Sequence, residues 1–334
     1  MKVAAIQMNS SDSVSDNLNL LDSLLAVACQ QDNSLVLLPE NFAFMGHPKQ
    51  LVQEVMEDFN DGPIQSFVAD KAKEYGLWVV AGSIPIKNHD QSKSRARCII
   101  IDASGALVSY YDKIHLFDVV VNGKTYNESS YIEPGSTPKS VQTPWFKLGL
   151  SICYDVRFPE LYRSKTYQDS DLIVVPAAFT VETGKAHWQT LLSSRAIENL
   201  CYVMASAQWG KHYGKRTTYG HSMIVDPWGE IKDVLPTGNG VVSTEINLEF
   251  YKYINKSYCK TASLIANSTK AAGVLSNLED EQLNLLYEFG KNIGLAFQVV
   301  DDILDFTGND KQLGKPAVSD LASGYLTAPV LYAL

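Results

Sequence analysis

The sequence has few cysteines, and no two of them are spaced like a metal-binding or redox cysteine pair. Its 334 residues include five cysteines, and no two of these are two residues apart. An odd number without such a pair argues against a disulfide framework and against a zinc ribbon. We therefore expect a reducing compartment, the cytoplasm. The cysteines are Cys29, Cys98, Cys153, Cys201 and Cys259.

A basic stripe and a long apolar run are also absent. The formal net charge is −9, whereas a nucleic-acid-binding surface needs clustered Lys and Arg, so we expect no nucleic-acid partner. No segment approaches the roughly 18 apolar residues that cross a bilayer. Gln7 interrupts the short apolar run at the start, which argues against a secretory signal. The chain is long enough for one large domain or two smaller ones.

Strand-like and helix-like segments alternate over the first 247 residues. Ser15 or Asp16 can cap a first helix, and Pro63 and Gly76 stand where a second helix would begin and end. Interleaved strands and helices predict a layered α/β domain. Strands are expected at 3–8, 35–38, 77–82, 97–101, 148–153, 172–175, 201–207 and 221–225, and further helices at 159–167 and 185–200.

The pattern changes near residue 248, after which strand signals vanish and helical segments follow one another. Seven apolar residues at steps of three and four predict one apolar stripe on a helix. They are Leu283, Leu286, Phe289, Ile293, Phe297, Val300 and Leu304. We therefore predict two domains, residues 1–250 and residues 251–334.

Three chemically useful side chains stand where strands end. Glu40, Lys113 and Cys153 each follow an apolar strand-like segment, and α/β folds usually keep their sites at the carboxyl ends of strands. A carboxylate can take the proton of a thiol that attacks a carbonyl or nitrile carbon. A lysine ammonium and a backbone N–H, such as that of Tyr154, can stabilise the oxyanion. The same carboxylate can later activate water.

Each of these residues alone also has an ordinary structural explanation. A cysteine at a strand end is usually a small buried hydrophobe, Glu40 alone would be a surface charge, and Lys113 could pair with Asp112. The surrounding segments decide the matter. Residues 39–42 (PENF), 111–118 (YDKIHLFD) and 153–160 (CYDVRFPE) resemble, in order, the signature segments of the carbon–nitrogen hydrolase (nitrilase) superfamily. The resemblance covers residues 1–247.

The resemblance implies a fold, an assembly and a set of catalytic residues. The fold is a four-layer α-β-β-α sandwich, α/β in class, which assembles as a homodimer or a larger oligomer. The catalytic group is a Glu–Lys–Cys triad, here Glu40, Lys113 and Cys153, and the enzyme needs no metal or cofactor. A second glutamate orients the lysine, and segment 126–135 gives that role to Glu128.

Other segments favour one subgroup of the superfamily. Residues 176–180, 184–188, 195–199, 207–210 and 219–229 are similar to the Nit subgroup, which includes deaminated glutathione amidase and ω-amidase. Both hydrolyse amides of 2-oxo acids in metabolite repair. Segment 41–46 and Trp188 favour the deaminated glutathione type, with the ω-amidase type as the alternative.

The small-molecule amide should bind close to the triad. Phe179 and Thr180 are expected to line the acyl pocket, together with Tyr154. Arg157 is the candidate partner for a substrate carboxylate. The alternative for Arg157 is a structural ion pair with Asp155 or Glu160.

The second segment carries an aspartate motif. Asp301, Asp302 and Asp305 form a DDxxD pattern in which residues 301 and 305 would share a helix face. Hard oxygen ligands suit Mg²⁺, although a solvated acidic face is the alternative. Segments 258–266, 314–321 and 327–329 with this motif resemble long-chain trans-polyprenyl diphosphate synthases over residues 254–334.

That family carries another aspartate-rich motif upstream, which this chain lacks. We therefore expect a fused synthase fragment without prenyl transfer, and Mg²⁺ only if the fragment is functional. A further hypothesis is a non-catalytic subunit that binds a complete polyprenyl synthase.

Overall fold

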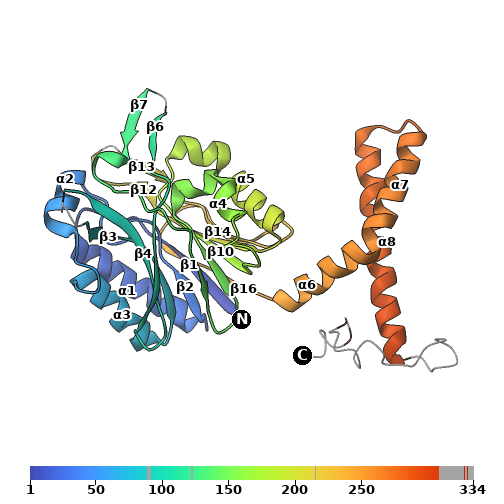
Figure 1. Cartoon of the computed structure of the whole chain (residues 1–334), viewed down its shortest axis with the longest axis horizontal. Helices are drawn as coiled ribbons and strands as arrows, with labels where there is room; N and C mark the ends of the chain where they lie inside the picture. The colour runs from blue at the N-terminus through green and yellow to red at the C-terminus, as the bar shows by residue number, and fades with distance from the viewer. Residues whose placement is uncertain (89–91, 122, 215, 308–326, 328, 330–334) are drawn as a thin grey trace. The chain divides into compact units, whose positions relative to one another are not determined.

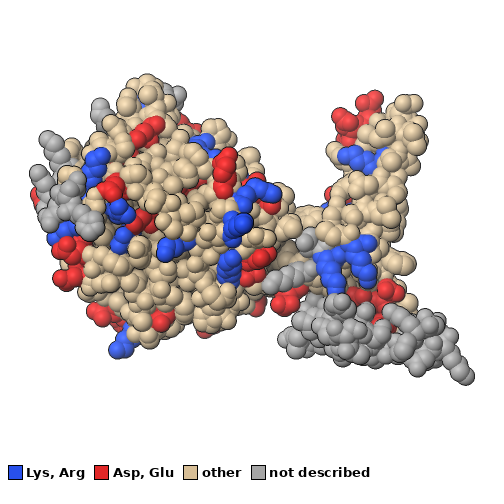
Figure 2. Space-filling model, in the orientation of Figure 1, with Lys and Arg blue, Asp and Glu red and all other residues tan. Residues whose placement is uncertain are grey.

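The computed structural model divides the chain into two compact units, Met1–Ile246 and Asn247–Leu334 (Figure 1). The structure describes residues 1–88, 92–121, 123–214, 216–307, 327 and 329. Figure 2 shows Lys and Arg side chains together with Asp and Glu side chains on the visible face of the first unit.

The first unit contains two six-stranded sheets. In the first sheet the central strands β1, β2 and β3 are parallel, and the outer strands run antiparallel to their neighbours. Its order is β16 (Gly240–Glu245), β1 (Lys2–Gln7), β2 (Leu35–Leu37), β3 (Trp78–Lys87), β4 (Ser94–Ile101) and β5 (Leu107–Asp112).

The second sheet repeats this plan and packs against the first. Its strands β9, β10 and β11 are parallel, and β1 of the first sheet contacts β11. A parallel bridge between Met8 and Gln208 continues β1 and β11 beyond their ends. The order is β15 (Ile231–Leu235), β14 (Ser222–Val225), β11 (Tyr202–Ala207), β10 (Leu172–Ala177), β9 (Lys147–Leu150) and β8 (Ser140–Gln142).

Helices cover the two outer faces of this pair of sheets. Helices α1 (Val14–Gln30) and α3 (Pro63–Tyr75) pack on the first sheet, and α4 (Pro159–Tyr162) and α5 (Val181–Asn199) lie on the side of the second (Figure 1). Burial of both sheet faces explains why the parallel strands are apolar throughout. The predicted four-layer α-β-β-α architecture is confirmed.

Local signals set several helix ends. Helix α3 begins at Pro63 and ends before Gly76, whose φ of 65° is the left-handed conformation that glycine adopts without strain, as predicted. The cap of α1 differs from the prediction of Ser15 or Asp16. It is Ser13, whose side chain accepts a hydrogen bond from the backbone N–H of Asp16. The helix predicted at 159–167 ends at Tyr162, because turns closed by Ser164 and Tyr167 replace its second half.

Short elements lie at the ends of the central strands. Two hairpins, β6 (Asp118–Val121) with β7 (Lys124–Asn127) and β12 (Trp209–Lys211) with β13 (Thr217–Tyr219), rise from this edge (Figure 1). Two 3₁₀ turns, Glu128–Ser130 and Cys153–Arg157, follow β7 and β9. A short helix α2 (Pro48–Gln50) continues into a π-helical turn at Leu51–Val55.

The second unit is helical. It contains α6 (Leu248–Ser257), a π-helical turn (Tyr258–Ala262), α7 (Ser263–Leu275) and the long α8 (Asp280–Thr307), which packs against α7. Gly290 allows the close approach to α7, since a Cβ there would lie 2.9 Å from the Cα of Ala266, and Gly294 allows one to the π-helical turn, where a Cβ would lie 2.4 Å from the Cα of Ala262. Within the described residues, no helix is both long enough and apolar enough to span a membrane.

Only the start of the predicted apolar stripe packs inside the unit, where the side chains of Leu283 and Leu286 lie over Gly273 of α7. Phe289 and Phe297 are 58% and 62% exposed within the described residues. The face toward the other helices of the unit instead carries glycines and polar side chains, among them Gln298 and Asp302. Segment 314–321 of the synthase resemblance lies outside the described residues.

Candidate active site

Glu40 follows β2 in a turn held by hydrogen bonds on both sides. The N–H of Asn41, which has a φ of 57°, donates to Ser83 Oγ at 2.8 Å, and Gln208 Nε2 donates to the carbonyl oxygen of Glu40 at 3.1 Å. The turn also packs closely against Gly82, where a Cβ would lie 1.9 Å from the carbonyl oxygen of Pro39. Glycine at position 82 therefore lets the backbone that carries Glu40 approach β3.

Lys113 follows β5 and is fixed through its backbone. Its N–H donates to the carbonyl of Ala96 at 3.0 Å, and its own carbonyl accepts from the N–H of Gly135 at 2.7 Å. Position 135 has no room for a side chain, because a Cβ there would lie 2.3 Å from the carbonyl oxygen of Asp112. These contacts hold the start of the lysine side chain in one place.

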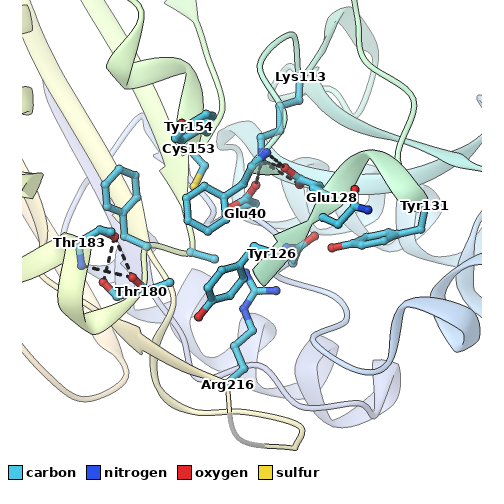
Figure 3. A pocket seen from close by; sticks show the side chains of 15 residues that line it. Glu40, Lys113, Tyr126, Glu128, Tyr131, Cys153, Tyr154, Thr180, Thr183 and Arg216 are labelled. Atoms are coloured by element: carbon cyan, nitrogen blue, oxygen red, sulfur yellow. Dashed lines mark hydrogen bonds and ion pairs between the residues drawn. The ribbon is translucent and has the colours of Figure 1, made fainter. Parts of the chain in front are cut away.

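Cys153 stands at a sharp turn after β9. Its φ of 49° lies in the left-handed region that non-glycine residues seldom adopt, and it begins the 3₁₀ turn Cys153–Arg157. The strand predicted at 148–153 ends earlier, at Leu150, and its last predicted residue begins the turn. The bend points the cysteine out of the sheet toward the pocket (Figure 3).

Asp155 joins the segments that carry Cys153 and Lys113. Its fully buried carboxylate accepts from the N–H groups of Ile152 and His115, each at 2.9 Å, and from the hydroxyl of Tyr111 at 2.7 Å. A buried carboxylate needs such donors to offset its lost hydration. The residue therefore sets the spacing between the end of β5 and the end of β9.

The ammonium of Lys113 lies between two carboxylates (Figure 3). Its Nζ is 2.7 Å from Oε1 of Glu40 and 2.8 and 2.9 Å from the two oxygens of Glu128. Burial acts to lower the pKa of Lys113, but the charges of Glu128 and Glu40 outweigh it and raise the pKa well above its usual value. Lys113 is therefore a cation at neutral pH.

The carboxylate of Glu128 is itself held by a backbone hydrogen bond. It opens the 3₁₀ turn Glu128–Ser130, and its Oε2 accepts from the N–H of Phe117 at 2.6 Å. Segment 126–135 thus brings a second glutamate to Lys113, at the place that the sequence resemblance implied. The carboxylate can fix the direction of the ammonium.

The thiol of Cys153 is kept protonated at neutral pH. Burial is the largest influence that raises its pKa, and the neighbouring charge of Glu40 adds to it. Lys113 and the backbone N–H of Ala178 act in the other direction without reversing the shift, so the pKa lies well above the usual value. A thiol in this state needs a base to become a nucleophile.

A pocket of about 530 Å³, its open mouth included, lies over these groups. Its walls contain all four predicted catalytic residues, together with Tyr154, Phe179 and Thr180 from the predicted substrate set. Thr180 also caps α5 by accepting from the N–H of Thr183. One surface therefore holds a thiol, two carboxylates, an ammonium and aromatic rings.

The structure does not place Arg157 in this pocket. Its Nη2 lies 3.2 Å from Nδ1 of His187, and its guanidinium lies over the rings of Tyr154 and Phe179, 5.9 and 5.5 Å from their centres. Neither of the alternative ion pairs, with Asp155 or Glu160, is found among the described residues, and Asp155 binds the His115 segment instead. Arg157 thus packs against two residues that line the pocket, and its contact with a substrate carboxylate stays a prediction.

Sequence reasoning missed several lining residues, above all Arg216, and also Tyr131 and Thr183. Arg216 comes from the hairpin β12–β13, about sixty residues after Cys153. The only signal was its position just before segment 219–229, which resembles the Nit subgroup. Nothing local predicted that its side chain would enter the pocket.

The three aspartates of α8 are not gathered into one site. Asp302 and Asp305 are buried, whereas Asp301 is exposed. Asp302 accepts from the hydroxyl of Tyr253 at 2.6 Å and from Gln298 Nε2 at 3.0 Å. Over the described part of the chain, no group of three or more His, Cys, Asp or Glu side chains could hold a metal ion. This geometry does not fit the magnesium site predicted for the second segment.

Comparison with known proteins identifies the family. The carbon–nitrogen hydrolase family model matches residues 2–255. The chain therefore belongs to the carbon–nitrogen hydrolase family and is an amide-hydrolysing enzyme that works through a cysteine. The family predicted from the three signature segments is confirmed.

Two curated relatives and one solved structure illustrate which members of the family are similar to this chain. The deaminated glutathione amidases of Synechocystis sp. (strain PCC 6803 / GT-S) and Dictyostelium discoideum are 41% and 39% identical to this chain. The matches cover 76% and 73% of this chain and 94% and 87% of those proteins. Saccharomyces cerevisiae Nit3, a member of branch 10 of the nitrilase superfamily, is similar with a TM-score of 0.69 at 29% identity, over 77% of this chain and 93% of Nit3.

The end of the chain is similar to a second family. The polyprenyl synthetase family model matches residues 189–334. The part of this match before residue 247 falls on the end of α5 and on strands β11 to β16, all of which belong to the first unit. The helical unit therefore carries the synthase resemblance, as the sequence indicated.

Proposed function

We propose that the first 250 residues cleave the amide of a small 2-oxo acid through a thioester on Cys153. Glu40 is the general base, Lys113 stabilises the oxyanion, and Glu128 positions Lys113. The observation that carries the proposal is the buried ammonium of Lys113, held between two carboxylates beside a protonated thiol.

In the first half of the reaction the sulfur of Cys153 attacks the amide carbon while Glu40 takes the thiol proton. The oxyanion is stabilised by Lys113 and by a backbone N–H such as that of Tyr154. Lys113 makes two contacts with one carboxylate, Glu128, so one N–H can turn to the oxyanion while Glu128 stays paired. Glu40 then protonates the leaving nitrogen, the C–N bond breaks, and the thioester remains.

In the second half, water replaces the amine. Glu40, again ionised, takes a proton from the water as its oxygen attacks the thioester carbon. The C–S bond breaks, the acid leaves, and the proton on Glu40 returns to the sulfur of Cys153. One carboxylate thus serves both halves, and the proposal requires no metal or cofactor.

The substrate proposed is deaminated glutathione, which makes the enzyme one of metabolite repair. The support is the name shared by relatives from a cyanobacterium, an amoeba and mammals at 35–41% identity. A 2-oxoglutaramate-like substrate of the ω-amidase type is the second candidate, since it carries the same acyl group with a smaller leaving group. The pocket, with aromatic and cationic walls, suits that acyl group.

The proposal includes a cytoplasmic location and a homodimer or larger assembly. Five cysteines, no two of which are two residues apart in the sequence, accord with a reducing compartment. Sedimentation of the purified chain tests the assembly.

The test is an assay of the purified full chain on deaminated glutathione and on 2-oxoglutaramate, with release of 2-oxoglutarate as the readout. We expect turnover by wild type and by Cys259→Ser, which alters an exposed cysteine of the other unit. Cys153→Ala should be inactive. Equal rates for wild type and Cys153→Ala would refute the proposal.

A further inference from the structure

Two cations line the pocket, and they differ in how they are paired. Lys113 has its ammonium hydrogen bonds directed at Glu40 and Glu128. The guanidinium of Arg216 forms no ion pair with a described residue, and its Nε is buried without a hydrogen-bond acceptor. Arg216 is therefore the lining cation with capacity left for a ligand.

A buried N–H of a charged group without an acceptor is costly. Such a donor has lost its hydration without a replacement, and most buried polar groups in proteins are therefore hydrogen-bonded. The pocket supplies no acceptor for Nε of Arg216 from the described residues. A bound anion would satisfy it, and the flat guanidinium fork matches a carboxylate better than any other common acceptor.

The hairpin that carries Arg216 is anchored to the body of the unit. The carbonyl of Arg216 accepts from the N–H of His212 at 2.9 Å. The buried ring of His212 lies 2.7 Å from the carbonyl of Ser10 through Nδ1 and 2.7 Å from the hydroxyl of Thr218 through Nε2. In Figure 3 the Arg216 side chain extends into the pocket from the side opposite Lys113. The backbone that carries the Arg216 side chain is thus anchored beside the pocket.

The charges of the pocket favour the same role. Glu40, Glu128 and Lys113 together carry one net negative charge, which repels an anionic substrate. Arg216 is the group that offsets this charge at the wall where a substrate would lie. A carboxylate that contacts Arg216 would therefore offset the repulsion between an acid amide and the two glutamates.

We propose that Arg216 binds the carboxylate of the substrate's acyl group and thereby selects amides of dicarboxylic acids. This inference rests on the proposed function and assigns its substrate class. Arg216 is a specificity residue, and it takes the role that the sequence had suggested for Arg157.

The main test compares 2-oxoglutaramate with its methyl ester, which lacks the negative charge, using ammonia release as the readout. In Arg216→Met the KM for the acid should rise about 10- to 100-fold, the loss expected for a charged hydrogen bond, with a smaller change in kcat. The KM for the ester should stay close to wild type. Arg216→Lys should restore part of the preference, since it keeps the charge but loses the fork.

Two control variants make the result specific. Arg163→Met removes an exposed arginine outside the pocket and should behave as wild type. Arg157→Met tests the rival residue, and loss of acid preference there, with Arg216→Met unaffected, would overturn the proposal. An equal rise in KM for the acid and the ester in Arg216→Met would also overturn it. A purely structural effect of Arg216 would not depend on the charge of the substrate.

A third comparison fixes which carboxylate is bound. The leaving group of 2-oxoglutaramate is ammonia, so its only carboxylate belongs to the acyl group. If Arg216→Met impairs hydrolysis of deaminated glutathione but not of 2-oxoglutaramate, the carboxylate bound is that of the leaving group, and the proposal fails.

A binding experiment separates this inference from the proposed function. Calorimetry should show that 2-oxoglutarate binds the wild-type full chain more tightly than it binds Arg216→Met, by the same 10- to 100-fold or so. Binding that depends on Arg216 in a protein without amidase activity would uphold this site and refute the function. Amidase activity, together with 2-oxoglutarate binding that is equal in wild type and Arg216→Met, would uphold the proposed function and refute this site.

Discussion

The ammonium nitrogen of Lys113 lies 2.7 Å from Oε1 of Glu40, with the two side chains only 1% and 3% exposed. Such a pair is tolerated in a protein interior when both partners have further hydrogen bonds. Lys113 has them through Glu128. The buried site thus keeps a cation and a proton acceptor side by side, next to a thiol that needs both.

Glu128→Gln should lower kcat by roughly 10- to 100-fold while changing KM little, as expected for loss of one charged hydrogen-bond partner. With one anion fewer, Lys113 turns toward Glu40 alone, which weakens Glu40 as a base. Steady-state kinetics on the best substrate measures this. Glu133→Gln is the matched control, since Glu133 pairs with Arg95 outside the pocket. Equal kinetics for Glu128→Gln and Glu133→Gln would contradict the role of Glu128.

Gly82→Ala should destabilise the protein and impair catalysis together. A Cβ at this position would lie 1.9 Å from the Pro39 carbonyl oxygen, so the turn carrying Glu40 must move. We expect a loss of roughly 3 kcal/mol in the free energy of unfolding, from overlap and a positive φ combined. Urea unfolding and kcat are the measurements.

Gly76→Ala is the control for that change. Gly76 also has a positive φ, of 65°, but a Cβ there would meet nothing within 4 Å. This variant should lose only about 1 kcal/mol of stability and keep its kcat. If both variants behaved alike, the contact with Pro39 would have no special effect.

The stability of the first unit should fall as the pH drops below 6.5. Burial lowers the pKa of His212 to about 4, against the raising effect of its hydrogen bond to Ser10. Above pH 6.5 the imidazole is neutral in both folded and unfolded chains, and its contribution is complete. Between about pH 6.5 and 4 the unfolded chain binds a proton that the folded chain does not, so stability is lost, up to about 3 kcal/mol.

Urea unfolding at pH 7.5 and pH 5 checks this, with His212→Gln and the exposed His187→Gln side by side. His212→Gln should start less stable at pH 7.5 and then lose less on acidification than wild type. His187→Gln should follow wild type. A His212→Gln protein that loses as much stability as wild type would show that His212 is not the cause.

Much of the first unit could be predicted from the sequence, because its signals are local. A few neighbouring residues are enough to predict each apolar strand. The same holds for the start of α3 at Pro63 and its end before Gly76. The grouping of Glu40, Lys113 and Cys153 also followed, since strand ends meet at one edge of a sheet. The extra turn at Cys153 was missed, because its φ of 49° depends on Asp155 binding groups from β5 and the β9 end.

The substrate side of the site could not be predicted in this way. Arg216 lies at the pocket because His212 anchors its hairpin to Ser10, about two hundred residues away in the sequence. A contact between such distant residues cannot be predicted from a short sequence pattern. Arg157 was a candidate because it lies near Cys153 in sequence, and the structure places its guanidinium 5.9 Å from the ring centre of Tyr154 but not among the residues that line the pocket. On α8 the hydrophobic pattern marked a stripe, but close glycine contacts place the opposite face inside the unit.

The central claim is a thioester on Cys153 that Glu40 helps to form and to hydrolyse. The direct measurement is intact-protein mass spectrometry of Glu40→Gln after mixing with deaminated glutathione or 2-oxoglutaramate, followed by peptide mapping. The account predicts an added 2-oxoglutaryl mass on Cys153 that wild type sheds and Cys153→Ala never acquires. An acyl group on another residue, or turnover by Cys153→Ala, would contradict it.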